Sequence, residues 1–178
     1  KLAEQRERER RVQAARIDWR DGATLPFLGA AVVVVLDPRC GARPGGVVLN
    51  AAATALPGAL ALHVGLAHDA TPRQIRDAVQ SWLQRQARRI FEERCTHFAA
   101  LLGVRWCRLA VFADGSVRLN WRLVHFSMPT IDYVVAHELA HLRHMDHSPR
   151  FWDVVRSVVP DMDRARGALR SEVLPVFE

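Results

Sequence analysis

Residues 131–152, which read IDYVVAHELAHLRHMDHSPRFW, determine the predicted fold of the chain. Pro129 opens a helix in which apolar residues recur at spacings of three and four, and this periodicity predicts one buried face. The buried face consists of Ile131, Val134, Val135, Leu139 and Leu142. A break is expected at 145–147, and Ser148-Pro149 then starts a second helix that Pro160 ends. The stretch therefore predicts a helix, a break and another helix.

The first of these helices carries two histidines four residues apart, in the pattern H-E-L-A-H. His137 and His141 project from one face a turn apart, so both imidazoles can bind a single metal ion. Glu138 is offset from that face and can accept a proton from water on the ion without binding the ion itself. Zinc lowers the pKa of bound water to roughly 7. The pattern therefore predicts a Zn²⁺ hydrolase site with Glu138 as general base.

A third ligand is needed, because catalytic zinc typically has three protein ligands and leaves one position for water. His147 is assigned this role, since it lies just beyond the predicted helix end and the chain can turn back toward the ion. His144 is the rival ligand, because it would share the face of His137 if the helix continued. Three ligands along one straight helix do not readily converge on an ion, which favours His147. No other cofactor-binding residue is predicted.

Several neighbours of these histidines invite roles that the sequence leaves open. Asp146 is either a carboxylate that orients a ligand imidazole or a turn residue. Tyr133 and His125 are candidate donors to an oxyanion, and neither is assigned. Phe151 and Trp152 are interpreted as core residues beneath the site.

The first half of the chain predicts a small sheet followed by a long helix. Residues 25–36 and 46–66 are rich in Val, Leu and Ala and are interrupted by turn signals, which predicts three or four short antiparallel strands. Thr71-Pro72 starts an amphipathic helix over 72–102, and Gly103 ends it.

Two further β-rich runs, 105–112 and 117–126, are joined by Asp114-Gly115, which predicts a hairpin. Together these elements predict an α+β fold. We expect one domain over 23–178, preceded by a charged arm over 1–22.

The chain is basic, with a net charge of +6 and a pI near 10.4, which favours anionic partners. Residues 1–16 hold six Lys or Arg and three Glu, a pattern typical of a solvated helix or a frayed tail. The outward face of the 72–102 helix can contact phosphates or, as we favour, simply solvate the helix. Its cations are Arg73, Arg76, Arg85, Arg88, Arg89 and Arg94.

The cysteines and the apolar stretches bear on the compartment. Cys40, Cys95 and Cys107 form no C-x-x-C pair, and this favours a reducing cytoplasm. The longest apolar stretch, Ala23 to Leu36, is too short to span a bilayer and contains Pro26, so no transmembrane segment is expected.

Residues 131–152, the preceding VRLNWRL of 117–123 and Pro160-Asp161 resemble the YgjP-like metallopeptidases, distant relatives of the SprT and WLM zinc-peptidase domains. The resemblance spans roughly 105–165. It implies a zincin-like fold, with His137, His141 and His147 as zinc ligands, Glu138 as general base and a polypeptide as substrate. It also implies that the strand near 117–124 borders the cleft, where an extended peptide can pair with it.

The leading hypothesis is therefore a zinc-dependent metallopeptidase. Two alternatives remain open at this point. The arginine excess also suits a metal-dependent nucleotide pyrophosphohydrolase, since phosphates need cationic partners. Alternatively, the zinc is structural in a nucleic-acid-binding module, to which the basic arm and the arginine-rich helix supply affinity.

Overall fold

The structure is a computed structural model of the 178-residue chain and describes residues 2–41, 45–50, 58–106, 108–109, 116–172, 174–175 and 177. Backbone contacts divide the chain into two compact units. One comprises Lys1–Leu83 with Val173–Glu178, and the other comprises Gln84–Glu172.

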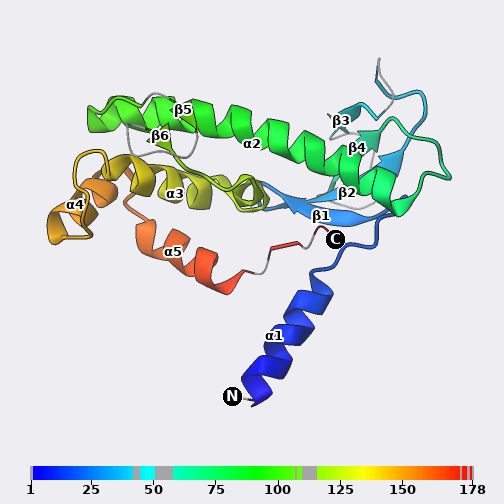
Figure 1. The fold of residues 1–178 in the computed structure, drawn as a ribbon, viewed down its shortest axis with the longest axis horizontal. Coiled ribbons are helices and arrows are strands. Elements are labelled where there is room, and N and C mark those ends of the chain that lie inside the picture. Colours follow the sequence, from blue (N-terminus) through cyan, green and yellow to red (C-terminus); the bar gives the residue numbers. More distant parts are fainter. Residues whose placement is uncertain are drawn as a thin grey trace. The chain divides into compact units, whose positions relative to one another are not determined.

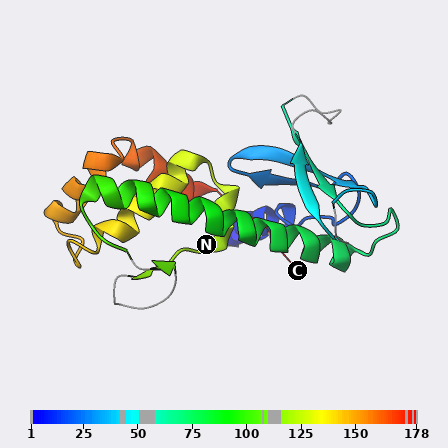
Figure 2. The same ribbon diagram turned by 90° about the horizontal axis from the view of Figure 1, so that it is seen from above.

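The first unit contains a four-stranded sheet in the order β1-β2-β4-β3. Its strands are β1 (Thr24–Phe27), β2 (Ala30–Leu36), β3 (Val47–Asn50) and β4 (Leu60–Val64). The hairpin between β1 and β2 turns through Leu28 and Gly29, with φ of 51° and 79° (Figure 2). Two successive positive φ values characterise the tight turn whose twist matches that of antiparallel strands.

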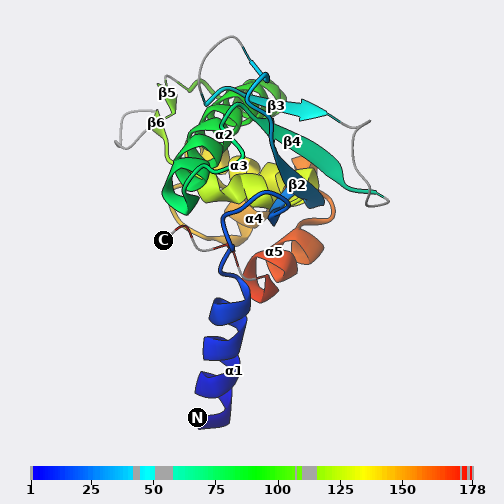
Figure 3. The same ribbon diagram turned by 90° about the vertical axis from the view of Figure 1, so that its right-hand side faces the viewer.

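The prediction of a purely antiparallel sheet is wrong for one strand pair. β1–β2 and β3–β4 are antiparallel, but β2 and β4 run parallel, with Val32 opposite Leu60 (Figure 3). β3 lies at the edge, next to β4, and runs antiparallel to it. The chain therefore reverses direction once between β2 and β3 and once between β3 and β4, which leaves the two central strands parallel. The central strands bury Val32, Val34, Leu62 and Val64 completely, whereas β3 is partly exposed, which explains why they occupy the interior.

Helix α1 (Leu2–Ala14) forms most of the charged arm. Its described side chains from Leu2 to Gln13 are all exposed, and Glu7 pairs with Arg11 one turn later at 3.2 Å. The solvated helix, one of the two readings of this arm, is therefore the one observed. A helix that is polar on all sides depends on such pairs more than on packing.

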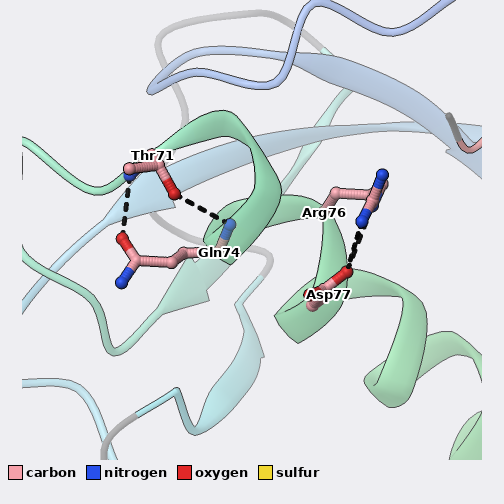
Figure 4. A network of polar contacts seen from close by, with 4 residues as sticks. All are labelled: Thr71, Gln74, Arg76 and Asp77. Atoms are coloured by element: carbon pink, nitrogen blue, oxygen red, sulfur yellow. Dashed lines mark hydrogen bonds and ion pairs between the residues drawn. The ribbon is translucent and has the colours of Figure 1, made fainter.

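Helix α2 (Pro72–Leu102) has the predicted bounds because local signals set both ends. The Thr71 backbone N–H donates to Gln74 Oε1 at 2.9 Å, and the Gln74 N–H donates to Thr71 Oγ1 at 3.2 Å (Figure 4). This reciprocal arrangement is a capping box. At the other end Gly103 adopts a φ of 65°, a conformation that suits glycine.

The second unit contains mostly helices; the last three of them are coloured from yellow to red in Figure 1. After strands β5 (Arg108–Leu109) and β6 (Ser116–Val117) come the 3-10 helix η1 (Trp121–His125) and helices α3 (Met128–Ala140), α4 (Pro149–Val158) and α5 (Met162–Ser171). Helix α3 packs against both α4 and α5. Ser148 is the N-cap of α4 and Pro149 lies in its first turn, as predicted. Helix α5 was not predicted from the sequence.

The predicted hairpin over 105–112 and 117–126 is wrong in two respects. β5 and β6 pair in parallel, and 121–125 forms η1 instead of a strand. Asn120 explains the second difference, since its Oδ1 accepts a hydrogen bond from the Arg122 backbone N–H at 3.0 Å and caps η1. Residues 110–115, which include the expected turn, lie outside the described residues. A 3-10 helix offers no strand edge, so the expected peptide pairing cannot extend over 121–125.

The α+β class is confirmed by the five helices and the four-stranded mixed sheet among the described residues. Within the same part of the chain, none of the helices combines the length and the apolar character that crossing a membrane requires.

Candidate metal centre

The three predicted ligands, His137, His141 and His147, lie together and are called the histidine cluster here. Each offers one ring nitrogen, and these nitrogens all lie within 4.8 Å of one another. The ring centroids are 5.0 Å apart for His137 and His141, and 4.8 Å apart for His141 and His147. One zinc ion with Zn–N distances of about 2.0–2.1 Å suits three imidazoles gathered this closely. The donor set therefore fits a single metal ion.

The end of α3 explains how the cluster forms. The helix ends at Ala140 with His141 as its C-cap, earlier than the break predicted at 145–147. The chain then turns, with the backbone N–H groups of Arg143 and His144 both donating to the Ala140 carbonyl at 3.0 Å. His147 follows this turn, directly before the N-cap of α4. The early helix end is what brings the third histidine back to the first two.

His144, the rival ligand, takes a different part. Its ring does not belong to the cluster found among the described residues, but its carbonyl oxygen lies 3.2 Å from His141 Nδ1. A carbonyl can only accept a hydrogen bond, so this contact places the proton on Nδ1. His141 Nε2 then keeps its lone pair for a metal ion.

Glu138 makes a similar contact with His137, the first histidine of the cluster. Its Oε1 lies 3.3 Å from His137 Nδ1, and the two side chains are 33% and 22% exposed. A carboxylate accepts a hydrogen bond from the Nδ1–H group, so His137 Nε2 is also left with its lone pair. The carboxylate stays partly open to water beside the cluster, where a general base is needed.

Two aromatic residues from the first turn of α4 pack against the cluster. Phe151 is fully buried, and its ring centroid lies 5.1, 4.5 and 5.0 Å from those of His137, His141 and His147. Trp152 is half-buried, with its ring 5.8 Å from those of both His137 and His147. The expected core position beneath the site is confirmed for Phe151, whereas Trp152 remains partly exposed.

The oxyanion candidates are both buried. Tyr133 is 5% exposed, and its ring lies 6.0 Å from that of His137. Burial raises the pKa of Tyr133, while the charge of Arg166 on α5 opposes this rise. His125 is 3% exposed and lies in η1, with its ring 6.2 Å from that of Trp121. Neither residue gains an assigned role from these positions.

Asp146, the candidate orienting carboxylate, is exposed. In the described contacts, Nδ1 of His137 donates to Glu138 and Nδ1 of His141 donates to the His144 carbonyl. Asp146 therefore gains no support as an orienting residue.

One anchor of the site was missed from the sequence. The Arg94 guanidinium binds the Asp132 carboxylate through Nε at 2.7 Å and Nη2 at 3.0 Å, which joins α2 to α3. The helical pattern predicts a solvated position for Arg94, and 38 residues separate it from its partner. The acidic residue at 132 within an otherwise apolar stretch was the available signal.

Most of the remaining arginine pairs on α2 are local. Arg76 pairs with Asp77, Arg88 with Glu92 and Arg89 with Glu93. These carboxylates offset the positive charge from which the sequence predicts binding to phosphate-containing partners. The arrangement gives no support to nucleic-acid or nucleotide binding by this helix.

Comparison with known proteins identifies a family. The model of a family described as YgjP-like, metallopeptidase domain, matches residues 1–172. The match thus extends well beyond the segment over which the sequence resemblance is specific. Neither a curated protein nor a solved structure matches the chain.

Proposed function

The chain belongs to the YgjP-like metallopeptidase family, and from this premise we propose that it is a zinc-dependent peptidase. His137, His141 and His147 are the proposed zinc ligands, and Glu138 is the proposed general base. A polypeptide is the substrate class that the family indicates. The proposed fold type is zincin-like.

The observation that supports this proposal most directly is the convergence of the three ring nitrogens within 4.8 Å. Two of the rings have their Nδ1 atoms in contact with acceptors, which leaves Nε2 available for the ion. Three neutral imidazoles without a carboxylate or thiolate are a donor set that catalytic zinc uses. The arrangement is thus compatible with zinc and leaves a fourth position open.

The ion, when bound, supplies Lewis-acid polarisation of the scissile carbonyl and makes water acidic enough to lose a proton near neutral pH. Glu138 accepts that proton as the water oxygen attacks the carbonyl carbon. The same carboxyl group then donates the proton to the departing amine nitrogen as the C–N bond breaks. Its position next to His137 on α3 keeps the carboxylate beside the cluster through both transfers.

The Glu138→Gln variant tests this mechanism. Gln preserves the size and shape of the side chain but cannot accept the proton, so zinc content is expected to stay at the wild-type level. Turnover of a peptide library is expected to fall by at least about 10²-fold, the typical contribution of a general base. Metal analysis and mass spectrometry of the digests measure the two quantities. A fully active variant would exclude Glu138 as the base.

The same assay separates the peptidase from the alternatives. A nucleotide panel run beside the peptide library is expected to give no metal-dependent release of phosphate or pyrophosphate, because the arginines of α2 that would bind phosphate largely have carboxylate partners.

Cys40 and Cys95 are free thiols, which is compatible with the proposed cytoplasmic location.

A further inference from the structure

The three histidines of the cluster are not held in the same way. His137 and His141 lie on or at the end of α3, and each has an acceptor next to its Nδ1. His147 is exposed and lies between two helices. Among the contacts of the described residues, no hydrogen bond reaches its ring. Something other than hydrogen bonding must orient this imidazole.

Ring packing supplies the orientation. The His147 imidazole stacks on the Trp152 indole at 5.8 Å with an interplanar angle of 24°, and Phe151 meets it edge-on at 5.0 Å and 87°. Phe151 touches all three ligands and serves as their common floor. The stacked Trp152 ring fixes the plane of His147, because rotation of the imidazole about its side chain would break the stacking.

Trp152 is itself held by a cation from another helix. The Arg166 guanidinium carbon of α5 lies 4.9 Å from the Trp152 ring centroid, within the range of a cation–π interaction. Arg166 is half-buried, and in the described part of the chain no carboxylate forms an ion pair with it. Its contact with the indole restricts the rotamers of Trp152. Because Trp152 stacks on His147, the orientation of His147 then also depends on Arg166 of α5.

We propose that Trp152, held in place by Arg166, is the positioning residue for the third metal ligand, His147. In this arrangement an aromatic stack does for His147 what hydrogen bonds do for His137 and His141. The inference rests on the proposed metal centre and adds the residues that orient its most exposed ligand.

Zinc affinity of the metal-free protein, measured by competition with a chromophoric chelator, tests the proposal. Trp152→Leu removes the flat ring and is expected to weaken zinc binding roughly 10–100-fold, the range typical of residues that orient a ligand. Trp152→Phe keeps an aromatic ring and is expected to lose less. Arg166→Gln is expected to weaken binding roughly 2–5-fold, whereas Arg166→Lys keeps the cation and restores it.

The absorption spectrum of the cobalt-loaded protein gives a second readout. Four-coordinate Co²⁺ absorbs strongly in the visible region, and the absorption falls when water ligands replace a histidine and the coordination number rises. Trp152→Leu is expected to lower this absorption toward that of His147→Ala. A residue that only stabilises the fold lowers the melting temperature without changing the spectrum, so the two roles are distinguishable.

Two matched controls are present in the same unit. Trp121 is also half-buried and lies under an arginine, with Arg122 5.0 Å from its ring centroid, but its aromatic neighbour is His125, which is not in the cluster. Arg170 lies one turn after Arg166 on α5. Trp121→Leu and Arg170→Gln are expected to keep wild-type zinc affinity.

The outcomes are distinct. A Trp152→Leu variant that binds zinc within about 2-fold of the wild type, or no more weakly than Trp121→Leu, overturns the positioning role and leaves the peptidase proposal standing. A wild-type protein that binds no zinc overturns both. Wild-type binding with selective loss in the Trp152 and Arg166 variants supports both.

Discussion

The Arg94 guanidinium and the Asp132 carboxylate form a two-point ion pair, at 2.7 and 3.0 Å, with only 22% and 21% of the side chains exposed. Asp132 lies five residues before His137 on α3, so the pair anchors the helix that carries His137 and Glu138. Bidentate geometry and partial burial make such a pair stronger than an ordinary surface ion pair.

Loss of one partner is therefore expected to be costly. Arg94→Leu leaves the Asp132 carboxylate half-buried without its partner, and the free energy of unfolding is expected to fall by about 1–3 kcal/mol. Urea denaturation measures the change. Arg88→Leu on the same helix is the control, because its pair with Glu92 is largely exposed and is expected to contribute less than about 1 kcal/mol. Equal losses in the two variants would contradict the special role of Arg94.

His144 and His147 are expected to respond differently to the same substitution. His144→Ala keeps the backbone carbonyl that faces His141 Nδ1, so one zinc per chain is expected to remain bound. His147→Ala removes a proposed ligand, and zinc affinity is expected to fall by more than the roughly 10–100-fold typical of an orienting residue. Chelator competition on both variants measures this. An equal loss in the two would mean that the His144 ring binds the metal.

Cys95 is expected to make stability fall at alkaline pH. Burial, aided by the nearby Glu92 carboxylate, raises the pKa of its thiol from 9.0 to about 12. Between these values the unfolded chain releases the proton while the folded chain keeps it. Stability from this thiol is thus complete below pH 9 and is lost as the pH rises toward 12.

Denaturation midpoints measured across that range are expected to fall less steeply for Cys95→Ala than for the wild type. Alkylation mapped by mass spectrometry gives an independent check, because Cys95 is expected to react only after unfolding. Parallel slopes in the wild type and Cys95→Ala would argue against the raised pKa.

Asn120 is expected to stabilise η1 through its cap. Asn120→Ala removes the acceptor for the Arg122 N–H and is expected to reduce the free energy of unfolding by about 1 kcal/mol. Asn120→Asp retains an oxygen at that position and should stay close to the wild type. Thermal and urea unfolding of both variants decide the matter, and a neutral Asn120→Ala would show that the cap is dispensable.

Features set by neighbouring residues were predictable from the sequence. Thr71 and Gln74 cap α2 from within one turn, and Gly103 ends it, so both bounds follow from local chemistry. The approach of His137 and His141 likewise follows from helix geometry. The proximity of His147 to these two residues could be predicted because a turn of a few residues has few ways to close.

Features set by distant partners were not predictable in this way. The parallel pairing of β2 with β4 depends on the position of β3 at the edge of the sheet. The pattern of apolar residues along the sequence does not indicate that position. The β-rich pattern of residues 121–125 suggests a strand, but the cap from Asn120 stabilises the 3-10 helix η1 instead. Helix α5 buries only Met162 and Ala165 clearly, so its apolar pattern is too sparse to mark a helix.

The histidine cluster comes entirely from a short run of chain, with His137 and His147 ten residues apart. Closing so short a loop loses little conformational entropy, whereas pairing β2 with β4 requires a much longer closure. Metal binding to such a site contributes directly to folding free energy. With zinc at the proposed site, we therefore expect the ion to bind early, before the sheet has assembled, and refolding to be faster with zinc than without it.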